Sequence, residues 1–255
     1  MAEFEAGVPI WVDVSSTDLD KTADFYTGLF GWTADRGGPE VGGYSIFKKN
    51  GKMVAGAGPT QMPEQPAAWS TYIQTDDAAA TAEAVRNAGG TVIAEPMQVM
   101  DQGTLAVFQD STGAFISVWQ PGLHKGAELV NEVGSFCWNE LYTRDMPRAK
   151  EFYQKAFNWQ PHETDMGQMK YTLFKVGDRD IGGGMSMDDV QIPAEVPPHW
   201  LVYFTVADIA EARSKAEQLG GTHATEQMDT PMGPFSVERD PVGAVFAFIQ
   251  FQSQG

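Results

Sequence analysis

Cysteine is nearly absent from this sequence, since Cys137 is the one cysteine among 255 residues. A single cysteine excludes an internal disulfide framework, and we expect the chain to work in a reducing compartment, the cytoplasm. Cys137 lies in the apolar stretch SFCW. A nucleophilic thiol and a structural thiol are both compatible with that setting, and we favour the second, a small buried side chain.

Positive charge and long apolar runs are also scarce. Lysine and arginine number 17 against 34 for aspartate and glutamate, which gives a net charge of −17 at pH 7. Such a surface repels polyphosphates, so nucleic acids and anionic membranes are not expected partners. We find no stretch apolar enough to cross a bilayer. The opening MAEFEAGVPIWVDVSS has acids where a secretory signal needs positive charge, which predicts that it is not such a signal.

What the sequence does have is an internal repeat. The phrase FYTGLFGW begins at residue 25, and FYQKAFNW begins at residue 152, which is 127 residues later. The same offset matches Trp11 with Trp138, Asp13 with Glu140, and Trp32 with Trp159. Because the duplication covers nearly the whole chain, we predict two domains, at residues 1–122 and 131–255, joined by a linker at residues 123–130.

Each half of the sequence is predicted to contain two units of a strand, a helix and further strands. An aspartate precedes each expected helix, where its carboxylate can accept from the free amides of the first turn. These aspartates are Asp18, Asp77, Asp145 and Asp208. Gly31 and Asn158 follow the two Phe-Tyr helices at matched positions, and both residue types tolerate the left-handed geometry of a helix C-cap. The repeated phrase is therefore interpreted as the buried end of a helix with its stop signal.

These features resemble a known superfamily. Four such units, the Phe-Tyr pair after a capping aspartate, and a D-x-x-G-A turn before the last strand of each half are similar to the vicinal oxygen chelate superfamily of glyoxalases, bleomycin resistance proteins and dioxygenases. The phrases WVDV, WNEL and FYxxxFxW resemble its tandem two-domain actinobacterial members, related to a mycobacterial antigen of about 30 kDa, in a superfamily that hosts unrelated chemistries on one fold. The resemblance implies an α+β fold of two tandem domains, each with two βαβββ units that form a curved, cup-like mixed sheet with helices outside.

Members of this superfamily hold a divalent metal inside the cup, on ligands from three strands. The matching positions are Trp11, Ser70 and Ser117 in the first half and Trp138, Leu201 and Ala247 in the second. None of these residues supplies the imidazole, thiolate or carboxylate that divalent metals need. We therefore predict that the family metal is absent and that the chain has no metal ligands and no cofactor. Of the four histidines, His199 alone lies near a cup strand, whereas His124 falls in the linker.

Strand alternation suggests what the cups hold instead. Residues two apart share a face, so if Trp11 and Trp138 point inward, Asp13 and Glu140 do too. Further side chains expected to line the cups and bind a ligand are Tyr72, Trp119, His199, Leu201 and Tyr203. For any single aromatic residue, core filling is the simpler explanation. A buried carboxylate is more informative, because it needs a cation, backbone donors or a polar ligand. Pairing with Lys48, Arg144 or Lys175 would be the purely structural explanation.

Two kinds of function are compatible with this pattern. In the first, the chain is a glyoxalase/bleomycin-resistance-like protein that binds a small apolar, aromatic or cationic molecule in metal-free, aromatic-lined cups. In the second, it is a glyoxalase-like lyase or isomerase, or a dioxygenase-related enzyme, with Glu140 as general base and Asp13 as its counterpart. The two cups need not be equivalent. The expected partner is a small molecule, and the chain itself is expected to be a monomer or a homodimer.

Overall fold

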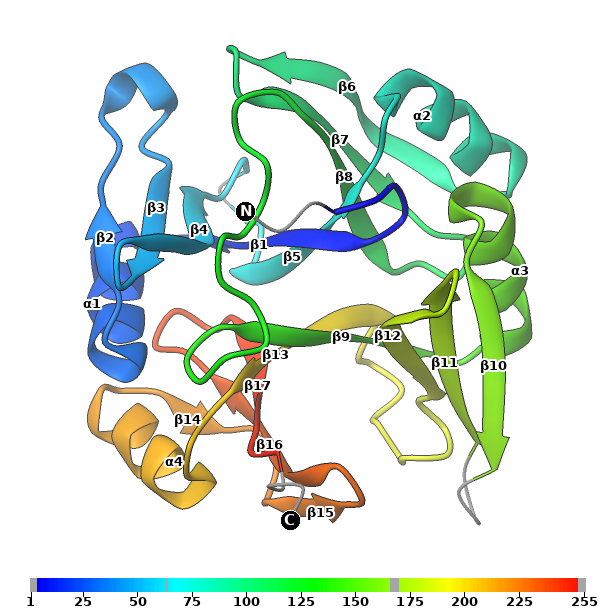
Figure 1. Ribbon diagram of the computed structural model, residues 1–255. Helices are drawn as coiled ribbons and strands as arrows, with labels where there is room; N and C mark the ends of the chain where they lie inside the picture. The colour runs from blue at the N-terminus through cyan, green and yellow to red at the C-terminus, as the bar shows by residue number, and fades with distance from the viewer. Residues whose placement is uncertain (1–3, 63, 166–169, 252–255) are drawn as a thin grey trace. The chain divides into compact units, whose positions relative to one another are not determined.

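The computed structural model describes residues 4–62, 64–165 and 170–251, and the described chain contains two β-sheets and four α-helices (Figure 1). The first sheet has eight strands in the order β2-β3-β4-β1-β5-β8-β7-β6. The second has nine strands, in the order β10-β11-β12-β9-β13-β17-β16-β14 with β15 paired to β16. Parallel pairs such as β1 with β4 and antiparallel pairs such as β3 with β4 occur in the same sheet. The predicted α+β class, with two βαβββ units in each mixed sheet, is confirmed.

The element bounds follow the repeat. The strands of the first sheet are β1 (Pro9–Ser16), β2 (Thr33–Asp35), β3 (Ser45–Lys49), β4 (Lys52–Pro59), β5 (Ala68–Gln74), β6 (Thr91–Val99), β7 (Gly103–Gln109) and β8 (Phe115–Pro121). Those of the second sheet are β9 (Phe136–Thr143), β10 (Gln160–Asp165), β11 (Lys170–Val176), β12 (Arg179–Ser186), β13 (His199–Thr205), β14 (Thr222–His223), β15 (Met228–Thr230), β16 (Gly233–Arg239) and β17 (Val245–Ile249). The helices are α1 (Leu19–Phe30), α2 (Ala78–Asn87), α3 (Met146–Phe157) and α4 (Ile209–Gln218), with a short 3₁₀ turn at Pro39–Val41. No helix among the described residues is both long and apolar enough to cross a membrane.

The two compact units of the chain do not coincide with the two sheets. One compact unit comprises Met1–Trp11, Thr71–Gly126 and Trp138–Leu201, and the other comprises Val12–Ser70, Ala127–Cys137 and Val202–Gly255. Each unit therefore draws segments from both halves of the sequence, whereas each sheet comes from one half. The predicted domain boundaries, 1–122 and 131–255, describe the sheets, and as boundaries of independent domains they stay a prediction.

The predicted helix caps are present at both ends of α1 and α3. The Asp18 carboxylate accepts from the amide of Lys21, and the Asp145 carboxylate accepts from the amide of Arg148. Gly31 ends α1 with φ 69°, and Asn158 ends α3 with φ 58°. Both angles lie in the left-handed region, which explains why glycine and asparagine stand at these matched positions.

In the first unit, the Phe-Tyr pair of α3 is fully buried. Phe152 and Tyr153 are both 0% exposed. The Tyr153 hydroxyl donates to the Asp110 carboxylate at 2.7 Å and accepts from the Trp200 indole at 2.7 Å. The other oxygen of Asp110 accepts from three amides of its own D-x-x-G-A turn, at 2.7, 2.8 and 3.0 Å. One buried carboxylate therefore shapes the turn and also fixes the helix, since each buried polar atom finds a partner.

The second unit repeats this arrangement with other residues. The Tyr26 hydroxyl of α1 donates to Asp240 at 3.0 Å and accepts from the Trp69 indole at 2.8 Å. Burial raises the pKa of Tyr26 well above its ordinary value, and the nearby Asp240 carboxylate raises it further, so the hydroxyl keeps its proton. The aromatic phrase is repeated because each unit needs one tyrosine to bridge a tryptophan and a turn aspartate.

Candidate functional site

A carboxylate that has no cationic partner among the described residues lies on one face of the second sheet. Glu140 is in the middle of β9, shares its face with Trp138, and is 5% exposed. Across the parallel pairing with β12, its neighbour is Gly183. The sequence predicted that Glu140 and Trp138 share a strand face, and both lie on β9, two residues apart.

A tyrosine that the sequence analysis missed holds this carboxylate. The Tyr171 hydroxyl, from β11, donates to Glu140 Oε2 at 2.9 Å. The Trp138 indole Nε1 donates in turn to the Tyr171 hydroxyl oxygen at 3.1 Å. Trp138, Tyr171 and Glu140 thus form a chain of hydrogen bonds that begins at the indole and ends at the carboxylate. We call these three residues, together with Gly183, the Glu140 site.

Gly183 is required by the position of Tyr171. A Cβ atom on Gly183 would lie 1.9 Å from the Tyr171 hydroxyl oxygen and 3.1 Å from Trp138 Nε1. Any side chain there would move the tyrosine away from Glu140. Gly183, on strand β12, therefore leaves the space that the Tyr171 hydroxyl occupies beside Glu140.

No lysine or arginine among the residues that the structure describes balances the charge of Glu140. Within residues 4–62, 64–165 and 170–251, no ion pair involves Glu140. The three cations considered for a structural pair bind elsewhere: Lys48 to Asp35, Arg144 to Asp188, and Lys175 to Asp180. Burial raises the pKa of Glu140 to about 7, although hydrogen bonds from Tyr171, Tyr142 and Trp138 oppose the rise. Near neutral pH the site can therefore hold either a carboxylate or a carboxylic acid.

This raised pKa predicts a stability that depends on pH. The folded protein binds a proton on Glu140 more tightly than the unfolded chain does, so the resulting stability is full below about pH 4.5 and is lost as pH rises through about 7. We expect the free energy of unfolding of Glu140→Gln, measured by urea denaturation, to lack a decline of about 1 to 3 kcal/mol that wild type shows between these limits. Identical pH profiles for the two proteins would contradict the assignment.

The first sheet carries the same arrangement on Asp13. The Tyr44 hydroxyl donates to Asp13 Oδ2 at 3.0 Å, and Asp13 is paired across β1 and β4 with Gly56. A Cβ atom on Gly56 would lie 2.0 Å from the Tyr44 hydroxyl oxygen. We call Asp13, Tyr44 and Gly56 the Asp13 site. Tyr44 and Tyr171, like Gly56 and Gly183, are 127 residues apart, so the repeat offset contained the signal that would have identified them.

Other predicted residues of the second half lie in two places. In the first unit, Leu201 is 2% exposed, and the His199 ring stacks on Tyr142 with centroids 5.4 Å apart. The His199 Nδ1 atom lies 2.9 Å from the Pro197 carbonyl oxygen, and burial lowers the pKa of His199, which favours the neutral ring. In the second unit, the Tyr203 ring lies 6.0 Å from the Phe235 ring and is 4% exposed.

The tryptophans predicted in the first half gather around a histidine. Trp11 and Trp119 are 3% and 8% exposed, and their rings lie 4.5 and 5.6 Å from the ring of His124. The Trp119 indole also donates to the His124 carbonyl at 2.9 Å. His124, which the sequence analysis placed in the linker, is thus half-buried against aromatic rings. Tyr72 lies on β5, paired with Ser117 of β8.

The residues at the family's metal positions do not fit a divalent ion. Trp11, Leu201 and Ala247 offer no oxygen, imidazole or thiolate, and Ser117 offers one neutral hydroxyl. In the part of the chain that the structure describes, no group of three or more His, Cys, Asp or Glu side chains could hold a metal ion. The single cysteine does not help, because burial raises the pKa of the Cys137 thiol to about 12 and the Sγ atom donates to the Tyr203 carbonyl.

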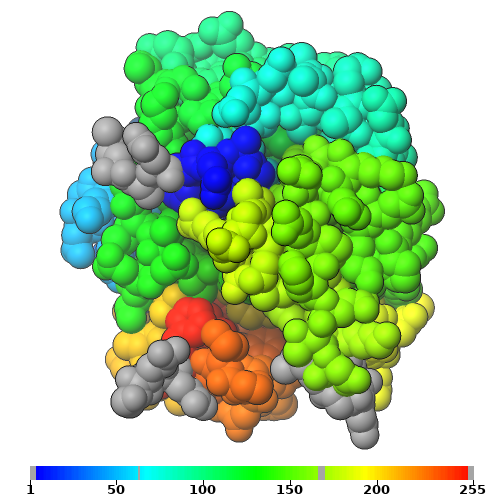
Figure 2. All heavy atoms as spheres, turned by 45° about the vertical axis from the view of Figure 1, so that its right-hand side comes forward, coloured from blue at the N-terminus to red at the C-terminus, as the bar shows by residue number. Residues whose placement is uncertain are grey.

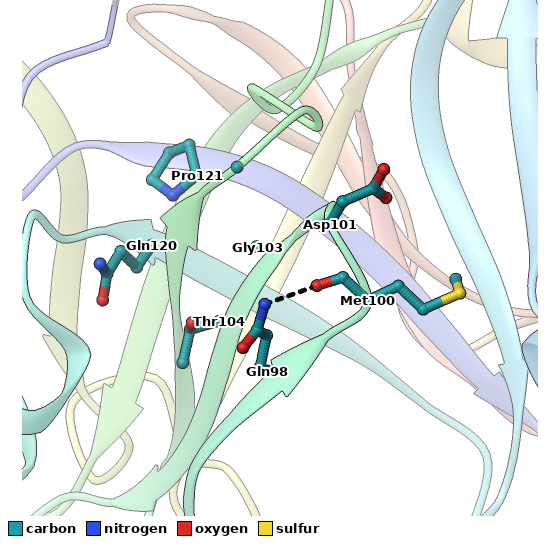
Figure 3. A pocket seen from close by; sticks show the side chains of 8 residues that line it. Gln98, Met100, Asp101, Gly103, Thr104, Gln120 and Pro121 are labelled. Carbon is teal, nitrogen blue, oxygen red and sulfur yellow. Dashed lines mark hydrogen bonds between the residues drawn. The ribbon is translucent and has the colours of Figure 1, made fainter.

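Two surface hollows of the first unit are lined by residues other than those of the Glu140 site. One, of about 150 Å³, is at the β6–β7 turn, where the Gln98 side chain donates to the Met100 carbonyl at 2.9 Å (Figure 3). The other, of about 340 Å³, lies in the first unit between the N-terminal residues and the end of α3, and it includes Gly7 and Asn158. Figure 2 shows the N-terminal residues of this unit, in blue, beside its yellow-green residues. Neither hollow gathers titratable groups as the Glu140 site does.

Known proteins are similar to this chain over its whole length. The family described as the Glyoxalase/Bleomycin resistance protein/Dioxygenase superfamily matches residues 10–118 and 132–248. The chain is 36% identical over 267 aligned positions to the anthracycline biosynthesis protein DnrV of Streptomyces peucetius, covering 99% of this chain and 96% of DnrV. It is 38% identical over 257 positions to the putative glyoxylase CFP32 of Mycobacterium bovis, covering 98% and 97%. The Mn(II)-bound glyoxalase from Novosphingobium aromaticivorans, at 14% identity, has a TM-score of 0.67 over 96% of this chain and 82% of that chain, which supports the fold alone.

Proposed function

Because the chain belongs to the Glyoxalase/Bleomycin resistance protein/Dioxygenase superfamily, whose fold serves both binding and catalysis, we propose that it binds a small organic molecule at the Glu140 site without the family metal. The ligand would have an aromatic or apolar body and a hydrogen-bond donor or positive charge directed at the carboxylate. In this proposal the protein works in the cytoplasm, and a small molecule is its partner.

The observation that carries the proposal is the buried carboxylate itself. Glu140 accepts from Tyr171 but has no ion pair in the described residues, so a donor or cation from a ligand would offset the cost of its burial. Trp138 and Tyr171, both half-buried, offer aromatic faces beside it, and aromatic faces attract ammonium groups and stack on planar molecules. The name of DnrV, an anthracycline biosynthesis protein, is compatible with an aromatic ligand.

The metal-free part of this proposal has its own test. We expect purified protein to contain well under one equivalent of any divalent metal, because Trp138, Leu201 and Ala247 supply no ligands. Treatment with EDTA should leave the melting temperature unchanged, and EDTA-treated protein should still bind benzylamine with saturable shifts of the Trp138 indole N–H signal in NMR. A stoichiometric metal whose removal abolishes benzylamine binding would overturn the metal-free proposal.

The raised pKa of Glu140 favours a second candidate function. A carboxyl group that titrates near pH 7 is suited to accept and return a proton, as the general base of a lyase or isomerase does. At neutral pH part of the Glu140 population would be deprotonated and able to accept a proton, without any metal. Turnover that is lost in Glu140→Gln while ligand affinity is retained would favour this enzyme over a binding protein.

A further inference from the structure

The Asp13 and Glu140 sites share a frame but differ in the side chains that surround it. In both, a tyrosine hydroxyl donates to the carboxylate, at 3.0 Å from Tyr44 and 2.9 Å from Tyr171. In both, a glycine beside the acid leaves room for the tyrosine. Positions around this frame can therefore be compared one by one, because the strand pairings of the two sheets correspond.

The acid and the residue two positions beyond it are smaller in the first sheet. Asp13 corresponds to Glu140, so the carboxylate is one methylene nearer its backbone. Ser15 corresponds to Tyr142, since each follows its acid by two residues on the same strand face. Ser15 is half-buried, whereas Tyr142 is 6% exposed. At this position the second sheet thus carries a tyrosine ring where the first carries the much smaller serine side chain.

The neighbouring strand differs in the same direction. Ser15 is paired with Gly58 on β4, and Tyr142 is paired with Met185 on β12. Gly58 has no side chain, and the ring of Tyr44 lies over it, with Cδ2 3.1 Å from where a Cβ atom would be. Met185 is 8% exposed and packs at the corresponding position.

A third strand completes the difference. Ala68 and His199 are the first residues of β5 and β13, which occupy the same place in their sheets. The His199 ring stacks on Tyr142, whereas Ala68 is exposed and contributes its carbonyl oxygen to a hydrogen bond from the Ser15 hydroxyl at 3.2 Å. All four comparisons therefore give the first sheet the smaller side chain.

We propose that the chain has two ligand sites of unequal width: the wide Asp13 site takes a fused-ring aromatic molecule, and the narrow Glu140 site takes a single-ring one. The common chemistry is a donor group, such as an ammonium or hydroxyl, that meets the carboxylate. The ring system that fits beside it is set by Ser15, Gly58 and Ala68 in one site and by Tyr142, Met185 and His199 in the other. The inference rests on the proposed function for the Glu140 site, and it adds a second site and its specificity.

Two amines of different size test this proposal. We expect calorimetric titration to give two molecules of benzylamine per chain but one molecule of 9-anthracenylmethylamine. In Ser15→Tyr/Gly58→Met, which copies the narrow site, affinity for the anthracenyl amine should fall by about tenfold or more, since overfilling a packed space is unfavourable. Benzylamine binding at Glu140 should be unchanged. If the double variant has a lower melting temperature than wild type, the titration is done with Ser15→Tyr alone, which leaves Gly58 beside Tyr44.

The outcomes separate this inference from the proposed function. Unchanged affinity for the anthracenyl amine in a folded Ser15→Tyr variant would overturn the assignment of the wide site, as would competition between the two amines at Glu140. In Glu140→Gln we expect weakened benzylamine binding at one of two sites and unchanged binding of the anthracenyl amine. If the anthracenyl amine binds at Asp13 while Glu140→Gln has no effect on either amine, the proposed function of the Glu140 site fails and the wide site stands.

Discussion

Replacing Phe152 with alanine is expected to lower the free energy of unfolding by about 3 to 5 kcal/mol. Phe152 is 0% exposed and lies in the core of the first unit, where its ring packs edge-on against Tyr153 with centroids 5.0 Å apart. Removing the ring takes away buried apolar surface and leaves a cavity that the close-packed core fills only in part. Urea denaturation monitored by circular dichroism measures the change.

Phe115→Ala is the matched control for this loss. Phe115 is 56% exposed, so the same substitution there should change the free energy of unfolding by less than about 1 kcal/mol. Benzylamine affinity of folded Phe152→Ala should equal that of wild type, because the residue serves the core and not the site. A Phe152→Ala protein with wild-type stability but no ligand binding would show that this helix face has been misassigned.

Glu140→Gln should weaken binding of benzylamine at the Glu140 site by about 1.5 to 3 kcal/mol, the range for a lost hydrogen bond to a charged group. Glutamine keeps the shape and can still accept from Tyr171, so what disappears is the negative charge. Benzyl alcohol, which is neutral, should lose much less. Isothermal titration calorimetry with both probes measures the difference.

The control for this substitution is Glu151→Gln, since Glu151 lies on the exposed face of α3 and pairs with Lys155. It should leave the affinity for both probes unchanged. Three outcomes of Glu140→Gln are distinguishable: weaker amine binding supports a binding role, intact binding with lost turnover supports a base, and a lower melting temperature alone supports a structural role. No change in melting, binding or turnover would remove Glu140 from the site.

The sequence was sufficient for local structure because local physics decides it. Asp18 and Asp145 cap helices, and Gly31 and Asn158 end them, through backbone geometry within a few residues. Alternation along β9 likewise placed Glu140 beside Trp138. Each of these inferences needed only short-range periodicity, which sequence preserves.

Contacts between distant strands were harder to predict. Tyr171 reaches Glu140 across two intervening strand pairings, and nothing near either residue in sequence indicates it. The repeat offset does match Tyr44 with Tyr171 in the sequence. That match indicates a site only when the strand pairing is known, because the pairing places Gly56 beside Asp13 and Gly183 beside Glu140. The packing of His124 on Trp11 and Trp119 could not be foreseen for a similar reason, because it joins the expected linker to distant strands.

The bond between Tyr26 and Asp240 has a consequence for biosynthesis. These partners are 214 residues apart, so α1 cannot complete its buried hydrogen bonds until nearly the entire chain has left the ribosome. In the nascent first half the Tyr26 hydroxyl would still lack Asp240, and contacts of such high sequence separation slow folding. Tyr153 and Asp110 are 43 residues apart, so the unit built around α3 can close earlier. Translation order therefore favours completion of the first unit before the second, because the second unit also needs the segment Val202–Gly255, which is synthesised last.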